Sequence, residues 1–548
     1  MAQQQQNISL TAPGFFGLNL EDAPIDIDQR FALRADNAVI DRFGRLGARK
    51  GLKPLLDSSP HADGDVRSIA RVVDNGVERV IAGVYIPSLD ENQIWEIQNI
   101  STNPTAIAIP LPVGYTLTDS NVQIFDFAGY GAIVGGGEML LLRNGSLSKL
   151  SDGPLILPQD DSGNLVAVMD PTNGTAAYGR LWVSGGSLGE ETLHYCNLNN
   201  PYEWYDGKAV PTNTFNTGGL VDVFEYWPNG RDRIIDLAAH NNMLVVFGRS
   251  SILIYGNPQG DPAAEGGLYL ADTIKGIGLV DRDALTSDGK DLLFVDDTGL
   301  RSLGRTIQEQ SAAIGDLTRP VRKEYQDSLK RALIAGGVEL VYDPSESFIL
   351  TILRGSNDVW VCDTRMPMQD GSLRTTRWPG QPVNCGYYDD ESERLVLGLA
   401  NKTPMVEYIG NTDYVGLDDE GPFNFVYWSP VLSFGDPVRS KFVKQIDFTV
   451  VSGIEQATST AAWEYVGVRP YEKLKFFKLQ GGEANYYGND GYLYNVAKYG
   501  EGDTVIRSYK VNADGSGENV IVKFSTQVNN SICSLQQINI QSLLGRII

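Results

Sequence analysis

Pairs of short apolar runs separated by turn residues recur along this chain, and they constrain its fold more than any other feature. The segment HNNMLVVFGRSSILIYGNP, residues 240–258, holds two such runs, MLVVF and ILIY, parted only by GRSS. β-Branched and aromatic residues favour strands, whereas Gly, Asn and Ser supply turns. The segment therefore predicts a β-hairpin, and we expect it to form the inner-to-middle strands of one larger unit.

Seven stretches repeat this pattern, and each one holds a strand, a turn, a strongly apolar strand, a second turn and another strand. They begin at Val66, Val122, Ala177, Ile234, Ala284, Val338 and Val383, which places their starts about 45 to 57 residues apart. A middle strand that is apolar throughout suits a sheet buried on both faces, and the spacing is typical of four-stranded propeller blades. We predict a mainly β fold, a β-propeller of six or seven blades. A long β-sandwich or a string of small β domains is the alternative.

One segment departs from the strand pattern. In LTRPVRKEYQDSLKRAL, residues 317–333, the apolar residues Leu317, Val321, Tyr325 and Leu329 stand four apart, and basic residues occupy the other faces. This spacing predicts one amphipathic helix, capped near Thr318, with Pro320 tolerated in its first turn.

The character of the chain changes twice, which predicts three regions. Residues 1–65 form an N-terminal arm with the first strands, which could belong to a platform, and residues 66–420 form the propeller. From residue 421 the runs FVYWSPVLSFGDPVRSKFVKQIDFTVVSG and ENVIVKFSTQVNNSICSLQQINIQSLL alternate apolar and polar residues, as exposed-edge strands do. Residues 421–548 are therefore expected to form a C-terminal β domain, with a long Gly/Tyr-rich excursion at 479–502.

Composition excludes several classes of protein. The 45 basic and 68 acidic residues give a net charge of −23, a field that repels phosphate and anionic lipid, so a protein that wraps nucleic acid is not expected. The four cysteines, Cys196, Cys362, Cys385 and Cys533, form no CxxC pair, and we expect buried thiols rather than a zinc site or disulfides. The N-terminus lacks a basic segment followed by an apolar core, and no apolar run approaches 18 residues.

Histidine and glycine patterns offer little catalytic chemistry. Only His61, His194 and His240 are present, far apart in sequence, so a triad or a His-rich metal site has few donors. His194 lies two residues from Cys196 on one predicted strand face, where a half-buried structural His is favoured over a nucleophile pair. The glycine clusters at 134–139 and 183–192 lack the Lys-Ser/Thr pair of a phosphate loop and are expected to be turns.

Acidic pairs and basic clusters each have a functional and a structural interpretation. Asp160-Asp161, Asp296-Asp297 and Asp389-Asp390 could serve acid/base or calcium chemistry, but each falls at a predicted turn, where Asp bonds to its own backbone. Basic residues gather at 319–331, 438–444 and 472–478, where DNA contact is the alternative to ordinary solvated charge. We therefore predict no catalytic, cofactor-binding or metal-ligating residues and no cofactor, and the protein is not expected to be an enzyme.

Several stretches together resemble one family. FGLNLEDAPIDIDQRFALRADNAVIDRFGRLGARKGL near the N-terminus is followed by LAAHNNMLVVFGRSSILIYGNP and GLVDRDALTSDGKDLLFVDDTGLRSL, and then by IGDLTRPVRKEY and VELVYDPSESFILTIL. Their order resembles that of the tail nozzle proteins (tail tubular protein B) of short-tailed bacteriophages, or podoviruses. The resemblance covers about residues 15–410, and its motifs are structural.

The resemblance implies a structural virion protein, made in the host cytoplasm and located in the viral tail. It implies a homohexameric ring below the head-to-tail adaptor ring, with possible tail-fibre contacts, through which genomic DNA is ejected without sequence-specific binding. An acidic wall would suit such a channel, because it would not retain the duplex. Exposed aromatic residues would then be interface candidates: Phe15, Phe16, Trp204, Trp227 and Trp378.

The excursion at 479–502 is the candidate for the part that closes the tube before infection. Two other functions stay open at this point: a glycan-binding or glycan-degrading propeller at a phage or cell surface, and a cytoplasmic scaffold that binds peptides.

Overall fold

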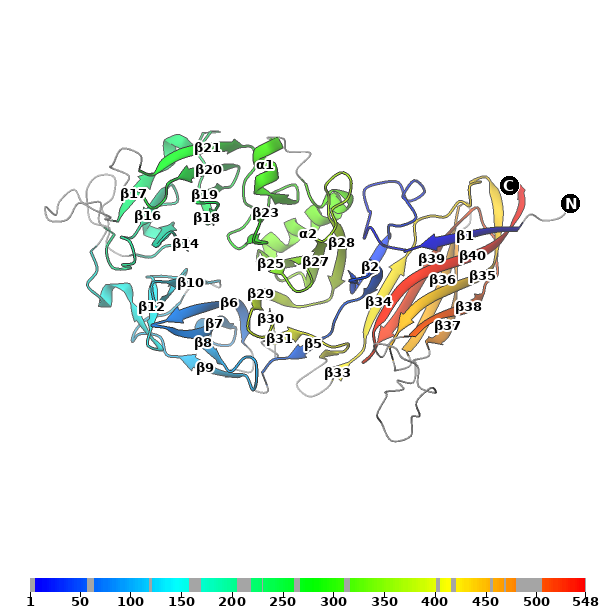
Figure 1. Ribbon diagram of the computed structural model, residues 1–548, viewed down its shortest axis with the longest axis horizontal. Helices are drawn as coiled ribbons and strands as arrows, with labels where there is room; N and C mark the ends of the chain where they lie inside the picture. The colour runs from blue at the N-terminus through cyan, green and yellow to red at the C-terminus, as the bar shows by residue number, and fades with distance from the viewer. Residues whose placement is uncertain are drawn as a thin grey trace, which may run out of the picture.

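The computed structural model describes most of the chain. The described residues are 5–56, 64–117, 121–156, 169–204, 218–228, 230–260, 267–309, 316–400, 405–414, 420–453, 457–467, 470–479 and 505–547. Figure 1 shows a ring of small sheets at one end of the molecule and a two-layered β body at the other, where both chain termini lie. The structure is thus mainly β, as the sequence predicts.

Four antiparallel four-stranded sheets follow one another in the first half of the ring. Blade one holds β6 (Asp65–Asp74), β7 (Val77–Ile86), β8 (Glu91–Gln98) and β9 (Thr105–Ile109), and blade two holds β10 (Gln123–Phe127), β11 (Tyr130–Val134), β12 (Leu140–Arg143) and β13 (Ser146–Lys149). Blade three holds β14 (Asn173–Ala177), β15 (Arg180–Ser184), β16 (Thr192–Tyr195) and β17 (Gly219–Asp222), and blade four holds β18 (Ile234–His240), β19 (Met243–Gly248), β20 (Ser251–Gly256) and β21 (Tyr269–Lys275).

The remaining three blades are modified. Blade five has β22 (Leu285–Ser287), β23 (Leu292–Val295) and β24 (Leu300–Ser302), and Asp316 bridges to Arg301 at its outer edge. Blade six has β25 (Val338–Asp343), β26 (Phe348–Leu353), β27 (Asp358–Asp363) and β28 (Arg374–Pro379). Blade seven has β29 (Val383–Asp389), β30 (Arg394–Leu399) and β31 (Met405–Tyr408), and the N-terminal strand β5 (Leu52–Pro54) pairs with β31 as its fourth strand.

The first strands of these blades surround one axis. Contacts run from β29 through β6, β10 and β14 to β18, and from β22 through β25 back to β29. Blades four and five meet through the rings of Phe247 and Phe294, whose centroids lie 5.2 Å apart. The described residues therefore form a seven-bladed β-propeller, and each blade begins within a few residues of a predicted repeat start.

The second strand of each blade is largely buried and therefore apolar, which explains why the repeats can be recognised in the sequence. Strands β11, β15, β23 and β26 are buried along their whole length, as sheets stacked on both faces require. The hairpin at 240–258 supplies β19 and β20. These are the second and third strands of blade four. The sequence predicted that the hairpin would include the innermost strand, and this was wrong by one strand, because β18 is innermost.

The predicted helix at 317–333 is confirmed with slightly later bounds. A 3-10 turn at Arg319–Val321 leads into α2 (Arg322–Ala335), and Leu317, Val321, Tyr325 and Leu329 are all buried. Thr318 stands at the predicted cap position, but its side chain does not cap the helix. Its hydroxyl instead donates a hydrogen bond to Asp316 Oδ1 at 2.8 Å. A second helix, α1 (Leu303–Glu309), was not predicted.

The C-terminal body is a β-sandwich. One layer contains β34 (Phe423–Trp428), β39 (Asn519–Val528), β36 (Ala457–Val466) and β37 (Tyr471–Leu479). The other contains β3 (Ala38–Ile40), β4 (Leu46–Ala48), β40 (Cys533–Ile547), β35 (Arg439–Ser452) and β38 (Val505–Asn512), with β1 (Gln5–Thr11) paired to β40. Strands β32 (Asp413–Tyr414) and β33 (Glu420–Gly421) form a small separate ladder.

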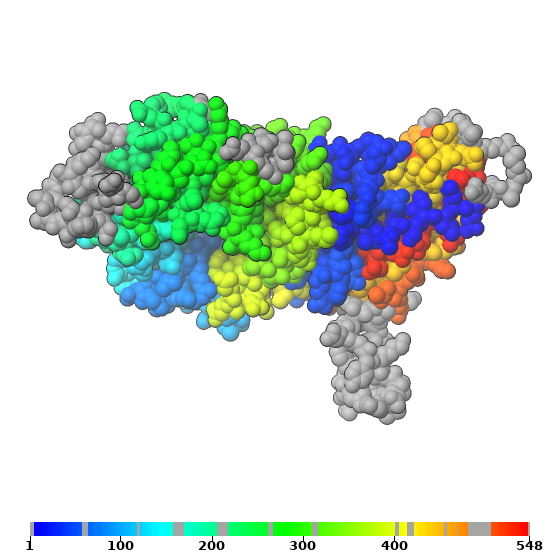
Figure 2. All heavy atoms as spheres, turned by 45° about the horizontal axis from the view of Figure 1, so that its top comes forward, coloured from blue at the N-terminus to red at the C-terminus, as the bar shows by residue number. Residues whose placement is uncertain are grey.

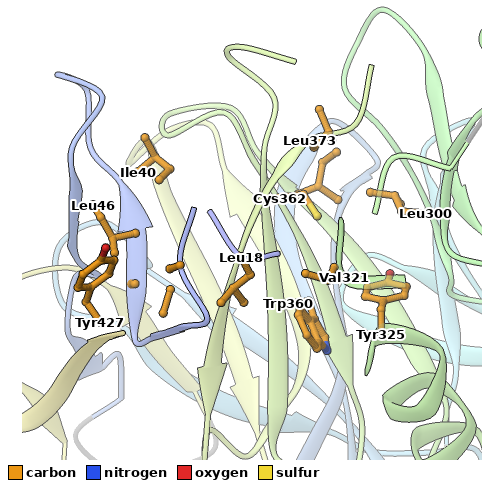
Figure 3. Packing of buried hydrophobic residues seen from close by; sticks show 14 of the residues in the cluster. Leu18, Ile40, Leu46, Leu300, Val321, Tyr325, Trp360, Cys362, Leu373 and Tyr427 are labelled. Carbon is orange, nitrogen blue, oxygen red and sulfur yellow. The ribbon is translucent and has the colours of Figure 1, made fainter. Parts of the chain in front are cut away.

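Strand β2 (Arg34–Asp36) joins the two bodies. It pairs in parallel with β28 of blade six and antiparallel with β34 of the sandwich, so that one nine-stranded sheet runs from β25 to β37. One apolar core extends through the same junction and includes residues of blades four to six, of the N-terminal segment and of both sandwich layers. Figure 3 shows Leu18, Ile40, Leu46 and Tyr427 on one side of this junction and Trp360, Tyr325 and Leu373 on the other.

Candidate functional site

Charged and polar side chains from several blades converge where the first strands meet. We call this group the axial network: Gln123, Asp236, Asp281, Arg282, Asp283, Glu339 and Arg354. They come from β10, β18, the segment before β22, β25 and the turn after β26. Because these strands surround one axis, residues far apart in sequence meet there.

Arg354 is the centre of the axial network. Its NH1 donates to Asp283 Oδ2 at 2.8 Å, its NH2 donates to Glu339 Oε2, and its Nε donates to the backbone carbonyl of Asn384 at 2.8 Å. The same NH2 lies 3.4 Å from the carbonyl of Arg67 in blade one. One guanidinium thus holds together blades five, six, seven and one.

Gln123 and Arg282 extend the network to the other blades. The Gln123 side chain accepts from the backbone N–H of Gly174 at 3.1 Å and donates to Asp236 Oδ2 at 3.2 Å. Arg282 NH1 donates to the carbonyl of Thr172 at 2.6 Å, and its NH2 donates to the carbonyl of Asn121. Blades two, three and four are therefore tied to the same charged centre.

The network has more carboxyl groups than guanidinium groups, since Asp236, Asp281, Asp283 and Glu339 face two arginines. Burial opposes the charge of Asp283, but Arg354 and Arg282 hold the pKa of this carboxyl below its usual value. Burial, aided by the Asp283 carboxylate, outweighs the attraction of Arg354 and raises the pKa of Glu339 to about 7. Burial likewise raises the pKa of Asp236 and of Asp281. A proton held on Glu339 lowers the cost of burying this cluster.

A cavity of about 250 Å³ opens onto the axial network and is lined by residues of blades one to six. Pockets that enclose small molecules usually measure about 300 to 1,000 Å³. The cavity is therefore small for an organic ligand, and its charged side chains already have hydrogen-bond partners within the network. Glu339 could exchange a proton near neutral pH, but the main effect of this geometry is to lock the blades together.

His194 and Cys196 do not form a reactive pair. His194, in β16, is 1% exposed, and burial lowers its pKa to about 4, so that the ring is neutral at pH 7. Burial raises the pKa of Cys196 to about 12, and its sulfur accepts from the N–H of Leu181 at 3.1 Å. His194 is more buried than the half-buried state expected from the sequence. His61 lies outside the described residues, and His240 Nε2 lies 3.9 Å from Asp291 Oδ1.

The acidic pairs that the structure describes lie in turns, where their carboxylates accept hydrogen bonds from nearby groups. Asp296 accepts from the N–H groups of Thr298 and Gly299 and from Arg301, while Asp297 accepts from Arg249 NH2 at 2.7 Å. Asp389 accepts from the N–H of Ser392 at 2.9 Å. The Asp160-Asp161 pair lies outside the described residues. The structural interpretation of the described pairs therefore fits their contacts.

The other sequence candidates are also engaged within the fold. The glycine clusters form turns in which Gly135, Gly136 and Gly185 have positive φ. Several of the basic side chains have acidic partners, as Arg319 has Asp370 at 3.5 Å and Lys473 has Asp514 at 3.4 Å. The four free cysteines are all buried, as predicted.

Most of the aromatic interface candidates lie in cores. Trp204, Trp227 and Trp378 are buried, and the indole of Trp378 stacks on Tyr408 of blade seven with ring centroids 5.0 Å apart. Phe15 and Phe16 are half-buried at the junction of propeller and sandwich. The excursion at 479–502 falls outside the described residues apart from Leu479, the last residue of β37.

The sequence did not reveal the axial network. Asp236, Asp283, Glu339 and Arg354 stand in unrelated local contexts, and no short motif joins them. The one available signal was that an acidic residue stands in or just before the first strand of blades four, five and six. Only the closure of the ring brings these positions together.

No protein-family model and no curated protein matches this chain. Among solved structures, a streptogramin B lyase aligns at 14% identity with a TM-score of 0.36, covering 66% of this chain and 97% of that one. A WD40 domain from Neurospora crassa aligns at 12% identity with a TM-score of 0.34, covering 66% and 94%. The extracellular domain of a one-component system from B. thetaiotaomicron aligns at 9% identity with a TM-score of 0.41, covering 74% and 55%. At these scores the likenesses carry no argument, and the fold rests on the strand pairing.

Two further observations concern the described residues alone. None of the helices there is long and apolar enough to span a bilayer. No group of three or more His, Cys, Asp or Glu side chains in the described ranges could hold a metal ion.

Replacement of Arg354 by Met is expected to lower the free energy of unfolding by about 3 to 5 kcal/mol, because it leaves Glu339 as a buried carboxyl without its cation and leaves Asp283 with Arg282 alone. Chemical denaturation at pH 7.5 measures this change. The triple variant Arg354→Met/Asp283→Asn/Glu339→Gln should recover much of the loss. Arg233→Met, which removes an exposed ion pair to Glu190, is the matched control and should cost less than about 1 kcal/mol. An equal loss in the control variant would contradict the central position of Arg354.

The contribution of Glu339 to stability should fall as pH rises from about 5 to 7.5, whereas that of His194, whose pKa burial lowers to about 4, should rise up to its ordinary 6.5. The pKa of Glu339 is higher in the folded state than its ordinary 4.5, so the folded protein binds the proton more tightly and loses this advantage as pH passes about 7. The effect is bounded at about 3 kcal/mol. Asp283 acts in the opposite direction, but only near or below its ordinary pKa of 3.8. Glu339→Gln should flatten the dependence in denaturation curves at pH 5, 6, 7 and 7.5, and an unchanged slope would refute this assignment.

Proposed function

We propose that this chain is a structural subunit of a phage tail, the tail nozzle of a short-tailed bacteriophage, which assembles as a ring of six around the path of the ejected DNA. The ordered motifs over residues 15–410 that resemble tail nozzle proteins lead to this proposal. The genome would pass through the lumen of the ring without sequence-specific contacts. The axis of each propeller is a separate feature and is not that path.

The continuity of the fold is the observation that carries the proposal. The nine-stranded sheet and the shared core make one body of propeller and sandwich. A subunit that must hold its shape while a charged polymer passes beside it benefits from such continuity, because bodies joined only by a linker move relative to one another. The axial network adds rigidity inside the propeller, since its ion pairs and hydrogen bonds together reach all seven blades.

The position of the chain ends and the net charge also support this role. Strand β1 pairs with β40 over Gln5–Thr11, so the first and the last described strands lie in the same sandwich layer (Figure 1). The net charge of −23 gives an overall field that repels the DNA backbone. We propose that the face lining the lumen is acidic or neutral, which would let the duplex slide.

The assembly state tests the proposal. Light scattering coupled to size-exclusion chromatography should detect a species of about 360 kDa, six times the 59.9 kDa chain, either alone or after addition of a head-to-tail adaptor ring. Negative-stain images of that species should show rings with six-fold symmetry. A chain that stays monomeric at high concentration and with its adaptor would contradict the proposal. Release of reducing sugar from host polysaccharide would favour a glycan-degrading propeller instead.

A further inference from the structure

A cleft of about 540 Å³ lies beside blade six, between the N-terminal segment, the start of the α2 region and the turn that joins β27 to β28. Its apolar lining comes from Phe15, Phe16, Phe31, Pro320, Met366 and Met368. The ring centroids of Phe15 and Phe16 lie 5.2 Å apart, and those of Phe16 and Phe31 are also separated by 5.2 Å. Methionine side chains adapt to the shape of an inserted group. This cleft is large enough for one or two aromatic side chains.

A buried cation without full compensation lines the same cleft. Arg374 is only 4% exposed and lies over the Phe15 ring, 4.9 Å from its centroid. Its NH2 donates to Asp363 Oδ2 at 2.8 Å, but Arg365 donates to the same carboxylate, so two guanidinium groups share one negative charge. Within the described part of the chain, the Arg374 Nε has no hydrogen-bond partner. The two guanidinium groups carry one positive charge more than Asp363 balances, which favours an occupant that brings a carboxylate.

The other cations of the cleft each have a carboxylate of their own. Arg30 pairs with Asp28 at 2.8 Å, and Arg319 pairs with Asp370 at 3.5 Å. The Glu21 carboxylate accepts from the N–H of Lys323, and the Asp22 carboxylate accepts from the side-chain amide of Asn19 at 2.8 Å. Arg374, which shares Asp363 with Arg365, is therefore the cation of the cleft without a carboxylate of its own.

This chain carries a segment with the complementary chemistry. After β17 of blade three, the 3-10 turn η3 (Phe224–Tyr226) exposes 45% of Phe224 and 48% of Tyr226, and Glu225 stands exposed between them. The N–H of Phe224 donates to Asp222 Oδ1 at 2.8 Å, and Trp227 is buried directly after the turn. Two exposed aromatic rings beside a carboxylate are therefore held out from the surface by a fixed turn.

The two surfaces lie on different sides of the propeller. Blade three and blade six are nearly opposite in a ring of seven. Figure 2 shows the residues around 220 (blue-green) at the end of the molecule away from the sandwich, while the N-terminal residues (blue) lie beside blade six (yellow-green). Contacts between unlike patches on opposite sides of a subunit are head-to-tail contacts, and such contacts build a ring where the rotation between successive copies closes.

We propose that the Phe224–Tyr226 turn of one copy docks in the cleft at Phe15, Phe16 and Arg374 of the next copy. The two rings fill the apolar part of the cleft, and the Glu225 carboxylate lies against the Arg374 guanidinium. Aromatic anchors in pockets commonly dominate such interfaces. This inference rests on the proposed ring assembly and names the surfaces that form it.

Disulfide cross-linking tests the contact. Tyr226→Cys and Met366→Cys are exposed positions, at 48% and 53%, and the four native thiols are buried. Mixing the two single variants under mild oxidation should give a covalent dimer, and the double variant should give a ladder of oligomers. Pairing Tyr226→Cys with Tyr269→Cys, which is also exposed, is the control and should give at least tenfold less dimer.

A second measurement separates failure of this inference from failure of the ring. In the full chain, Phe224→Ser/Tyr226→Ser should reduce the ring to smaller species without changing its circular dichroism. Glu225→Lys in the full chain should raise at least tenfold the protein concentration at which rings form in light scattering. Rings that form at full size with these substitutions and give no cross-link would overturn the inference and leave the ring proposal intact. A chain that never assembles would overturn both.

Discussion

An open edge of a β sheet leaves backbone amides and carbonyls unpaired, and the rest of this structure depends on how two such edges are closed. The last blade lacks a fourth strand of its own, and β5, from more than 300 residues earlier, supplies it through Leu52–Pro54. The outer edge of blade six is closed by β2, which then continues into β34 of the sandwich. The N-terminal segment therefore completes the ring and attaches it to the second body.

The axial network joins the blades of the same ring at its axis. Apolar packing between blades is non-directional and would tolerate small slips, whereas the bonds from Arg354 to Asp283, Glu339 and Asn384 fix the positions of particular strands. Burying charge is costly, and the raised pKa of Glu339 shows that this cost is met partly by holding a proton. The propeller thus gains a defined geometry at its axis at the expense of stability at higher pH.

The elements that the sequence predicted are those governed by local patterns. The seven repeat starts and the stripe of Leu317, Val321, Tyr325 and Leu329 follow from burial that repeats at short range. Strands β2 and β5 could not be predicted, because three-residue strands carry almost no periodicity and their partners lie hundreds of residues away. Of the residues that line the cleft, the sequence pointed only to Phe15 and Phe16, as interface candidates. Its cation, Arg374, stands in an ordinary strand sequence, and its importance depends on sharing Asp363 with Arg365.

Propeller and sandwich behave as one body in this account, and hydrogen exchange of the intact protein tests that claim most directly. The N–H of Leu33 donates to the carbonyl of Trp428 at 2.9 Å, and the N–H of Asn37 donates to the carbonyl of Arg377 at 2.8 Å, one bond toward each body. Both amides should exchange as slowly as those of the buried strand β26, since opening them requires separating the joined sheet. Rapid exchange of Leu33 and Asn37 while β26 stays protected would show that the two bodies move independently, and it would contradict the account.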